Sequence, residues 1–166
     1  MLSGRILYAV HNGTYVIKFV GDVRVPLCAS LEGFLERMFG DAELNAVLID
    51  LSDTVAIDST ALGLIAKIAV FLRERLDKKP VILSTNPDVN RILGSMGFDR
   101  VFLMLDRAPV TPADMEELVL SEPSQQELTR HVIEAHRVLM DMNDKNKATF
   151  CDLVQALETE QQCGKH

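Results

Sequence analysis

Hydrophobic positions in the first 105 residues follow two spacings, one typical of strands and one typical of helices. Residues 6–10 and 15–20 are runs of apolar, β-branched and aromatic side chains, and Asn12 and Gly13 between them favour a tight turn. Residues 46–51 are apolar except for an aspartate, which is typical of a strand covered on both faces. We therefore predict a β-hairpin at the start of the chain and a strand near residue 48 that is central in the sheet.

Three further segments place apolar residues three and four positions apart, which is the spacing of one helix face. They span residues 27–39, 59–76 and 87–96, and residues that favour helix ends flank them. Short apolar runs at residues 81–83 and 101–105 are typical of strands. This order predicts an α/β fold in which a mixed β-sheet is covered by helices.

The chain changes character after Arg107. Prolines punctuate the next stretch, and the remainder is rich in Glu, Gln, Asp and Lys without strand-like runs. Apolar residues recur at helical spacing over residues 128–142 and 150–157, with a polar break at residues 143–147. We predict a C-terminal extension of two helices, with residues 163–166 frayed.

Length and apolar content allow one domain with an appendage. The chain has 166 residues, of which 48% are apolar, enough for a single core of ordinary size. We assign residues 1–120 to this domain and residues 121–166 to the helical extension. The extension is expected to lengthen or mask a surface of the domain, or to form a homodimer through its helices.

Charge and cysteine usage narrow the classes of partner. The formal net charge of −7 repels phosphate backbones and anionic membranes, so we expect protein partners and neither nucleic acid nor lipid. Cys28, Cys151 and Cys163 form no CxxC pair, which argues against disulfides and a zinc site. No leader pattern and no apolar stretch of about 20 residues is present. We expect a cytoplasmic protein without a metal or another cofactor.

Asp58, Ser59 and Thr60 stand between a buried strand and an amphipathic helix, where two interpretations are open. Asp, Ser and Thr are common helix caps because their oxygens accept free amide hydrogens of the first turn. The same amides and the helix dipole also stabilise an anion, so a phosphate on Ser59 fits there without unfolding the helix. Such a phosphate adds about −1.5 to −2 charges.

The segment around Ser59 also resembles a known signature. Residues 47–50, the following loop and the stretch from Asp58 to Gly63 resemble the strand, loop and DS[ST]xLG signature of STAS-domain anti-sigma-factor antagonists. A second similarity is a short helix ending in a glycine before an aromatic residue, formed by Gly94, Met96, Gly97 and Phe98. The resemblance spans residues 4–118 and implies a STAS-like mixed sheet covered by helices.

The resemblance implies partner switching rather than catalysis. Ser59, the first hydroxyl after the aspartate, would be the phosphorylated residue. The unphosphorylated chain would bind an anti-sigma factor and free a sigma factor. A serine kinase would modify Ser59, and a phosphatase, or one bifunctional regulator, would reverse the modification. The expected contact surface includes the loop at residues 53–57 and the side chains of Asp22, Asp53, Asp58, Thr60, Ala61, Leu62 and Gly63.

Two features of this chain differ from the short members of the family. Gly21, Asp22 and Val23 are followed by Arg24, where the family often has a second acidic residue. The long extension resembles that of HsbA-type antagonists of flagellar and biofilm regulation, which suggests motility or biofilm genes as targets.

Other functions were weighed against this one. The main alternative is a constitutive STAS scaffold or ligand-sensing module, in which Ser59 is only a cap. A small α/β enzyme is a third option, but no GxSxG elbow surrounds Ser59, and we expect no histidine within its reach. His131 and His136 are five positions apart, about 140° around a helix, so they do not share a metal-binding face.

Overall fold

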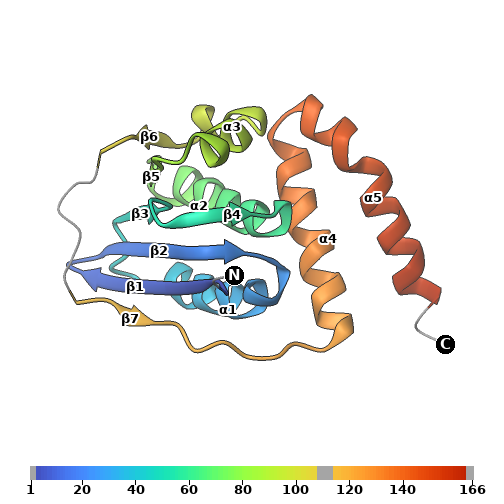
Figure 1. Ribbon diagram of the computed structural model, residues 1–166, viewed down its shortest axis with the longest axis horizontal. Coiled ribbons are helices and arrows are strands. Elements are labelled where there is room, and N and C mark those ends of the chain that lie inside the picture. The colour runs from blue at the N-terminus through green and yellow to red at the C-terminus, as the bar shows by residue number, and fades with distance from the viewer. Residues whose placement is uncertain (1–2, 108–113, 164–166) are drawn as a thin grey trace.

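The computed structural model describes residues 3–107 and 114–163, which form a sheet with helices packed against it (Figure 1). The strands are β1 (Arg5–His11), β2 (Thr14–Val23), β3 (Ala46–Asp50), β4 (Thr54–Ile57), β5 (Val81–Leu83), β6 (Leu103–Leu105) and β7 (Glu116–Glu117). The helices are α1 (Cys28–Phe39), α2 (Ser59–Leu76), α3 (Pro87–Ser95), α4 (Gln125–Met142) and α5 (Asp144–Cys163). Single turns of 3-10 helix occur at Val25–Leu27 and Phe98–Arg100.

The sheet is mixed, with the strand order β6-β5-β3-β2-β1-β7 and with β4 paired to β2. β1 and β2 form the predicted antiparallel hairpin, and its turn residues Asn12 and Gly13 have φ values of 50° and 80°. β3 lies between β2 and β5 and is parallel to both. The predicted α/β fold and the central position of residues 46–50 are therefore confirmed.

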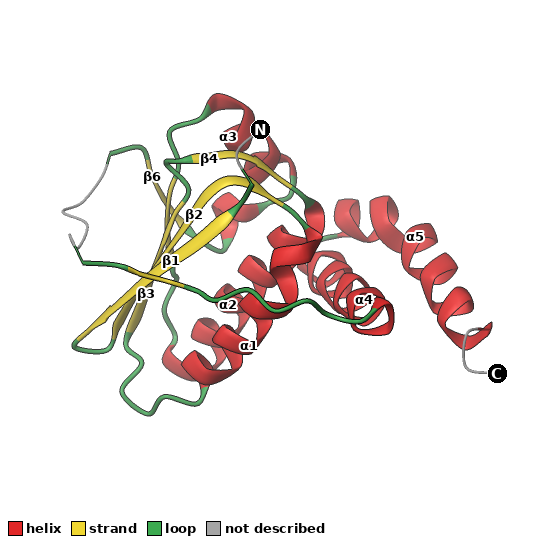
Figure 2. Ribbon diagram, turned by 60° about the horizontal axis from the view of Figure 1, so that its bottom comes forward, coloured by secondary structure: helices red, strands yellow, loops and turns green. Residues whose placement is uncertain are grey.

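The main core lies between the sheet and two helices. α1 and α2 lie on one side of the sheet (Figure 2). Phe19 and Ile49 of the sheet and Leu62 and Ile65 of α2 are fully buried there and belong to one hydrophobic cluster. α2 carries the apolar positions predicted for it, and this burial positions its first turn next to the carboxyl end of β4.

Several predicted boundaries need correction. Residues 54–57 were predicted as a loop, but they form β4, which pairs with β2 beyond a register shift at Gly21 and Asp22. The last strand begins at Leu103 rather than residue 101, and the two-residue β7 was not predicted. The polar break in the extension is the single residue Asn143, because residues 144–147 already belong to α5. The frayed end was predicted for residues 163–166, but Cys163 ends α5 and the rest lies outside the described residues.

The extension forms two helices, as predicted, and packs onto the α/β layer. Both ribbon views show α4 between that layer and α5 (Figures 1 and 2). Ala135 and Leu139 of α4 and Phe150 of α5 belong to the same hydrophobic cluster as the sheet and α2. We call α4 and α5 together the arm.

The backbones of α2 and the arm come close together at Gly63. A Cβ atom on Gly63 would lie 2.2 Å from the carbonyl oxygen and 2.7 Å from the Cβ of Ala135. Gly63→Ala therefore forces two helix backbones apart, and we expect it to lower the free energy of unfolding by about 1–3 kcal/mol. Urea unfolding followed by circular dichroism measures this loss.

Gly94→Ala is the matched control. Gly94 is inside α3, and nothing lies within 4 Å of a Cβ added there. The alanine should stabilise the helix by about 0.5–1 kcal/mol. A gain in stability for both variants would contradict the close approach at Gly63.

Candidate functional site

Asp58 connects the start of α2 to the loop after β2. One carboxylate oxygen, Oδ1, accepts a hydrogen bond from the Ala61 amide at 2.9 Å and caps α2. The other, Oδ2, accepts from the Val25 amide at 2.8 Å. The Asp58 amide in turn donates to the Val23 carbonyl oxygen at 3.0 Å. The capping interpretation of Asp58 is confirmed, and the same side chain fixes the 23–25 loop beside Ser59.

Ser59 is the first residue of α2, and its side chain is bonded to the arm. Ser59 Oγ lies 2.7 Å from Nε2 of His136, although the two residues are 77 positions apart in the chain. Nδ1 of His136 lies 2.6 Å from the Val132 carbonyl oxygen. Because a carbonyl oxygen only accepts hydrogen bonds, Nδ1 of His136 carries a proton in this contact. In the tautomer whose Nε2 is unprotonated, the Ser59 hydroxyl donates to Nε2.

Our expectation that no histidine reaches Ser59 is therefore wrong. The prediction failed because the 77-residue separation leaves no local signal of the contact. A serine hydrolase also needs an acidic group that orients the histidine, as in a Ser-His-Asp triad. Here the second ring nitrogen of His136 bonds to the Val132 carbonyl oxygen instead. Within residues 3–107 and 114–163, no carboxylate is hydrogen-bonded to this ring, so the pair lacks the third member of a triad.

The other signature residues of α2 are buried. Thr60, Ala61 and Leu62 are at most 3% exposed. Ala61 and Leu62 face the hydrophobic cluster, and Gly63 is covered by Ala135 of α4. Of the segment from Asp58 to Gly63, only Asp58 and Ser59 are partly exposed.

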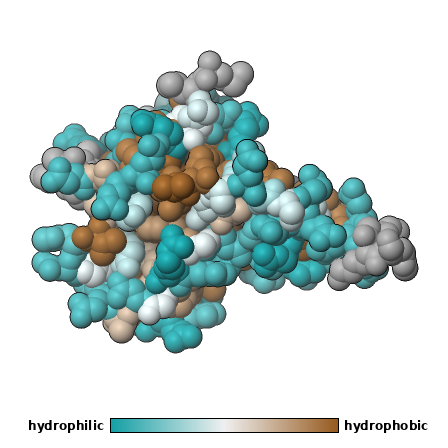
Figure 3. Space-filling model, turned by 90° about the horizontal axis from the view of Figure 1, so that it is seen from below, coloured by the Kyte–Doolittle hydropathy of each residue, from teal (hydrophilic) through white to brown (hydrophobic). Residues whose placement is uncertain are grey.

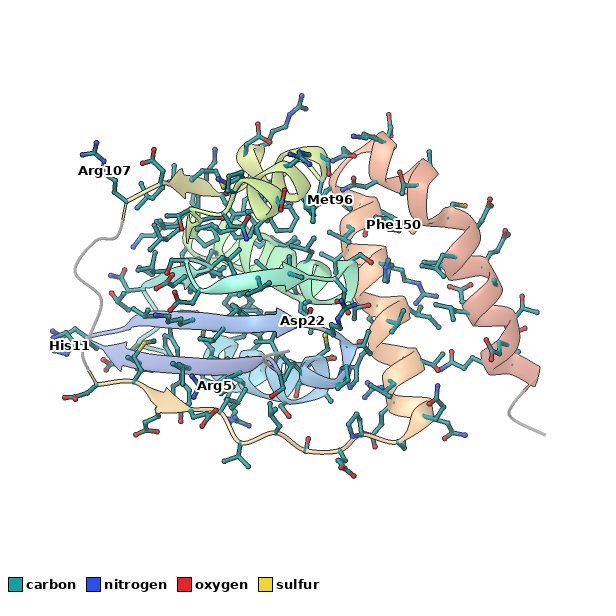
Figure 4. All side chains as sticks on the ribbon, viewed as in Figure 1. Arg5, His11, Asp22, Met96, Arg107 and Phe150 are labelled. Atoms are coloured by element: carbon teal, nitrogen blue, oxygen red, sulfur yellow. The ribbon has the colours of Figure 1, made fainter. Side chains whose placement is uncertain are left out.

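The two other predicted contact residues lie in different places. Asp22 is at the end of β2 that faces the arm (Figure 4) and forms an ion pair with Arg24 at 2.6 Å. The hydrogen bond that Arg24 Nε donates to Asp22 Oδ2 raises the pKa of the exposed Arg24 guanidinium. Asp53 precedes β4 and pairs with Lys18 at 2.8 Å. The length of β4 separates Asp53 from Asp58, so the structure brings Asp22, but not Asp53, next to the start of α2.

Cys28 is a buried thiol close to this loop. Burial, together with the nearby negative charges of Asp58 and Glu32, raises the pKa of this thiol to about 12. The thiolate is the reactive form, so Cys28 should stay unmodified by a thiol reagent at pH 9 in the folded chain.

Labelling of a Cys151→Ser, Cys163→Ser variant tests this prediction. With the other two cysteines removed, the folded chain should take up no label, and the chain in denaturant should take up one. Rapid labelling of the folded variant would contradict the burial of Cys28.

A second polar cluster joins the arm to α1. Glu32 of α1 and His131 of α4 form a buried pair, and their side chains are 7% and 6% exposed. Oε1 of Glu32 also lies 3.9 Å from Nζ of Lys67. Potential ligand atoms of Glu32, His131 and Glu134 all lie within 4.8 Å of one another. Because the Glu32 carboxylate already faces His131 and Lys67, we interpret the cluster as a polar network that positions α4.

The two histidines thus face different helices. His131 contacts α1 and His136 contacts α2. This agrees with the prediction that they do not share a metal-binding face. Their burial was not predicted, and helical spacing alone offers no signal of it.

Seen from below, the surface is largely hydrophilic with separate hydrophobic areas (Figure 3). A groove of about 700 Å³ lies between the second half of α2 and the end of α4, lined by charged residues of both signs. In the part of the chain that the structure describes, none of the helices has the length and apolar character needed to cross a membrane.

A protein-family model covers most of the sheet and the helices packed on it. The STAS domain family model matches residues 5–112, which is more than half of the chain. The chain therefore belongs to the STAS domain family, as the sequence signature implied.

Two solved structures share this fold. The anti-sigma factor antagonist SpoIIAA in its unphosphorylated form is 16% identical, with a TM-score of 0.53 over 63% of this chain and 89% of that chain. An anti-sigma factor antagonist from Mycobacterium paratuberculosis is 23% identical, with a TM-score of 0.53 over 63% of this chain and 87% of that one. At these identities the likeness is one of fold. A comparison with curated proteins found no match.

Proposed function

We propose that this chain is an anti-sigma-factor antagonist that Ser59 phosphorylation switches off. In its unphosphorylated form it binds an anti-sigma factor and so frees a sigma factor for transcription. The observation that carries this proposal is the position of Ser59 at the first residue of α2 in a STAS domain, directly after the capping Asp58. Both solved structures named above are anti-sigma factor antagonists.

The charge change at Ser59 supplies the switch. The first amides of a helix stabilise an anion, so a phosphate on Ser59 is compatible with an intact α2. A partner that docks there must remove water from the surface, and it then meets about −1.5 to −2 additional charges. Asp22 and Asp58 already place negative charge near this point, so the phosphate weakens binding of a partner with an acidic or apolar face.

The proposal includes the enzymes that set the phosphorylation state. A serine kinase modifies Ser59, and a phosphatase or one bifunctional regulator removes the phosphate, while the chain itself acts as ligand and substrate without catalysis. Sigma factors work with RNA polymerase in the cytoplasm, so the chain acts there. The predicted contact residues Asp22, Asp53, Asp58 and Thr60 to Gly63, and the domain division at residue 120, belong to this proposal.

Paired baits test the switch. Full-length Ser59→Ala and Ser59→Asp chains are used to capture proteins from the native cell lysate, with identification by mass spectrometry. We expect the alanine bait to capture an anti-sigma factor and the aspartate bait to lose it. Ser124→Asp is the matched control, because Ser124 also stands at a helix start, capping α4 in the exposed part of the arm. This control bait should capture the same protein as the unmodified chain.

A constitutive scaffold is the second candidate function. The observation in its favour is that Asp58 and Ser59 already satisfy structural roles, capping α2 and bonding the arm. Capture of the same proteins by the Ser59→Ala and Ser59→Asp baits would favour the scaffold and reject the switch.

A further inference from the structure

The arm covers the surface that the proposed function assigns to the partner. His136 of α4 holds the Ser59 hydroxyl at 2.7 Å. One residue earlier, the backbone of Ala135 leaves no space for even a Cβ atom on Gly63. Both ribbon views show α4 lying along this side of the α/β layer (Figures 1 and 2). A protein that uses the first turns of α2 therefore meets α4 before it meets α2.

Polar contacts at both ends fix α4 in this position. Near its start, buried His131 pairs with buried Glu32 of α1. At the junction of α4 and α5, the side-chain amides of Asn143 and Asn146 donate to the Met96 carbonyl oxygen at 3.2 and 2.9 Å. Met96 caps the carboxyl end of α3 (Figure 4), where free carbonyl groups need donors. Asn146 is 1% exposed, so this hydrogen bond satisfies a side-chain amide that is shielded from water.

The fit between the arm and α2 is tight at the start of α2. Ser59 and Gly63 are both in direct contact with α4. Further along α2, a groove of about 700 Å³ opens on the surface between this helix and Val138, Asp141 and Met142 of α4.

We propose that α4 is an intramolecular occupant of the Ser59 surface, which competes with the anti-sigma factor. The inference rests on the proposed function and adds how binding of the partner is regulated by the arm. In the docked form, α4 excludes the partner and shields the Ser59 hydroxyl from the kinase. When α4 leaves α2, an amphipathic surface of the partner replaces it. The arm thus sets the fraction of unphosphorylated molecules that can bind the partner.

Labelling of residue 59 tests the occupancy without any partner. The full chain carries Ser59→Cys together with Cys151→Ser and Cys163→Ser, and its reaction with a maleimide is timed. Adding Ala135→Glu places a charge against Gly63 and should undock α4, so the labelling rate should rise at least tenfold. Ala156→Glu is the matched control, because Ala156 is exposed on α5, and it should leave the rate unchanged. Equal rates in all three chains would overturn the proposal.

A second variant acts at a distance from the Ser59 surface. Asn146→Ala removes the shorter of the two hydrogen bonds to the Met96 carbonyl oxygen without touching α2, so any change at residue 59 must pass through the arm. We expect labelling at least threefold faster than with the unmodified arm. Circular dichroism checks that the helices and sheet persist. No acceleration in a folded Asn146→Ala chain would overturn the proposed coupling.

Competition is then measured with the protein captured by the Ser59→Ala bait. In that background, Ala135→Glu should bind it at least tenfold more tightly, and Ala156→Glu should bind it unchanged. Unchanged affinity for Ala135→Glu would overturn the competition. The comparison of maleimide labelling rates needs no partner. Failure of the inference can therefore be told apart from failure of the proposed function. The latter would show as equal capture by the Ser59→Ala and Ser59→Asp baits.

Discussion

Asp58→Ala should cost the chain about 2–4 kcal/mol of unfolding free energy, because the substitution removes two hydrogen bonds at once. The lost cap at the Ala61 amide accounts for about 1 kcal/mol of this value. The lost acceptor leaves the partly buried Val25 amide without its partner, which costs about 1–3 kcal/mol. Urea unfolding followed by far-ultraviolet circular dichroism is the measurement, since the chain contains no tryptophan.

Two comparisons separate this effect from a loss of charge. Asp58→Asn keeps one acceptor oxygen, so its stability should fall between the wild type and Asp58→Ala. Asp53→Ala removes an exposed carboxylate that pairs with Lys18, and its loss should stay below about 1 kcal/mol. If Asp53→Ala and Asp58→Ala destabilise equally, the double hydrogen bond of Asp58 is not what fixes the start of α2.

The second large loss of stability is expected when the buried pair of Glu32 and His131, which joins α1 to the arm, is broken. His131→Leu leaves the Glu32 carboxylate buried, with Nζ of Lys67 3.9 Å away as its remaining basic partner among the described residues. Breaking a buried ion pair costs about 3–5 kcal/mol, and the remaining Lys67 reduces the expected loss to about 2–4 kcal/mol. Replacing both partners, as in Glu32→Leu with His131→Leu, should recover most of the loss because no buried charge remains.

A double-mutant cycle measures the coupling between Glu32 and His131. The control is Arg91→Leu, which breaks the pair with Asp88 on α3, where both side chains are about 80% exposed. That substitution should change stability by less than about 0.5 kcal/mol. Additive losses at Glu32 and His131, with no recovery in the double variant, would show that the two side chains are not coupled.

Much of the α/β fold follows from local patterns. The hairpin was predictable because Asn12 and Gly13 favour the positive φ values that its turn requires. α2 and β3 were predictable because their apolar residues follow helix and strand spacings over long segments. β4 was missed because four residues between a turn and the start of a helix carry too little pattern, and their strand conformation depends on pairing with β2.

The candidate site was predictable only in its local part. Asp58 and Ser59 at a helix start could be identified from composition and order, because capping is a local interaction. The partner of the Ser59 hydroxyl could not, since His136 reaches it only when the arm folds back across 77 residues. The burial of Thr60 and Gly63 has the same origin, because the tertiary packing around α2 has no local signature in the sequence.

The most direct test of the account is the affinity of the full chain for its anti-sigma factor with and without a phosphate on Ser59. The protein captured by the Ser59→Ala bait is titrated with the unmodified chain and with a chain carrying phosphoserine at position 59. Like charges brought together at an interface cost several kcal/mol, so we expect the phosphoserine chain to bind at least about 100-fold more weakly. Equal affinity of the two chains would contradict the account and leave Ser59 as a helix-terminal residue without a switching role.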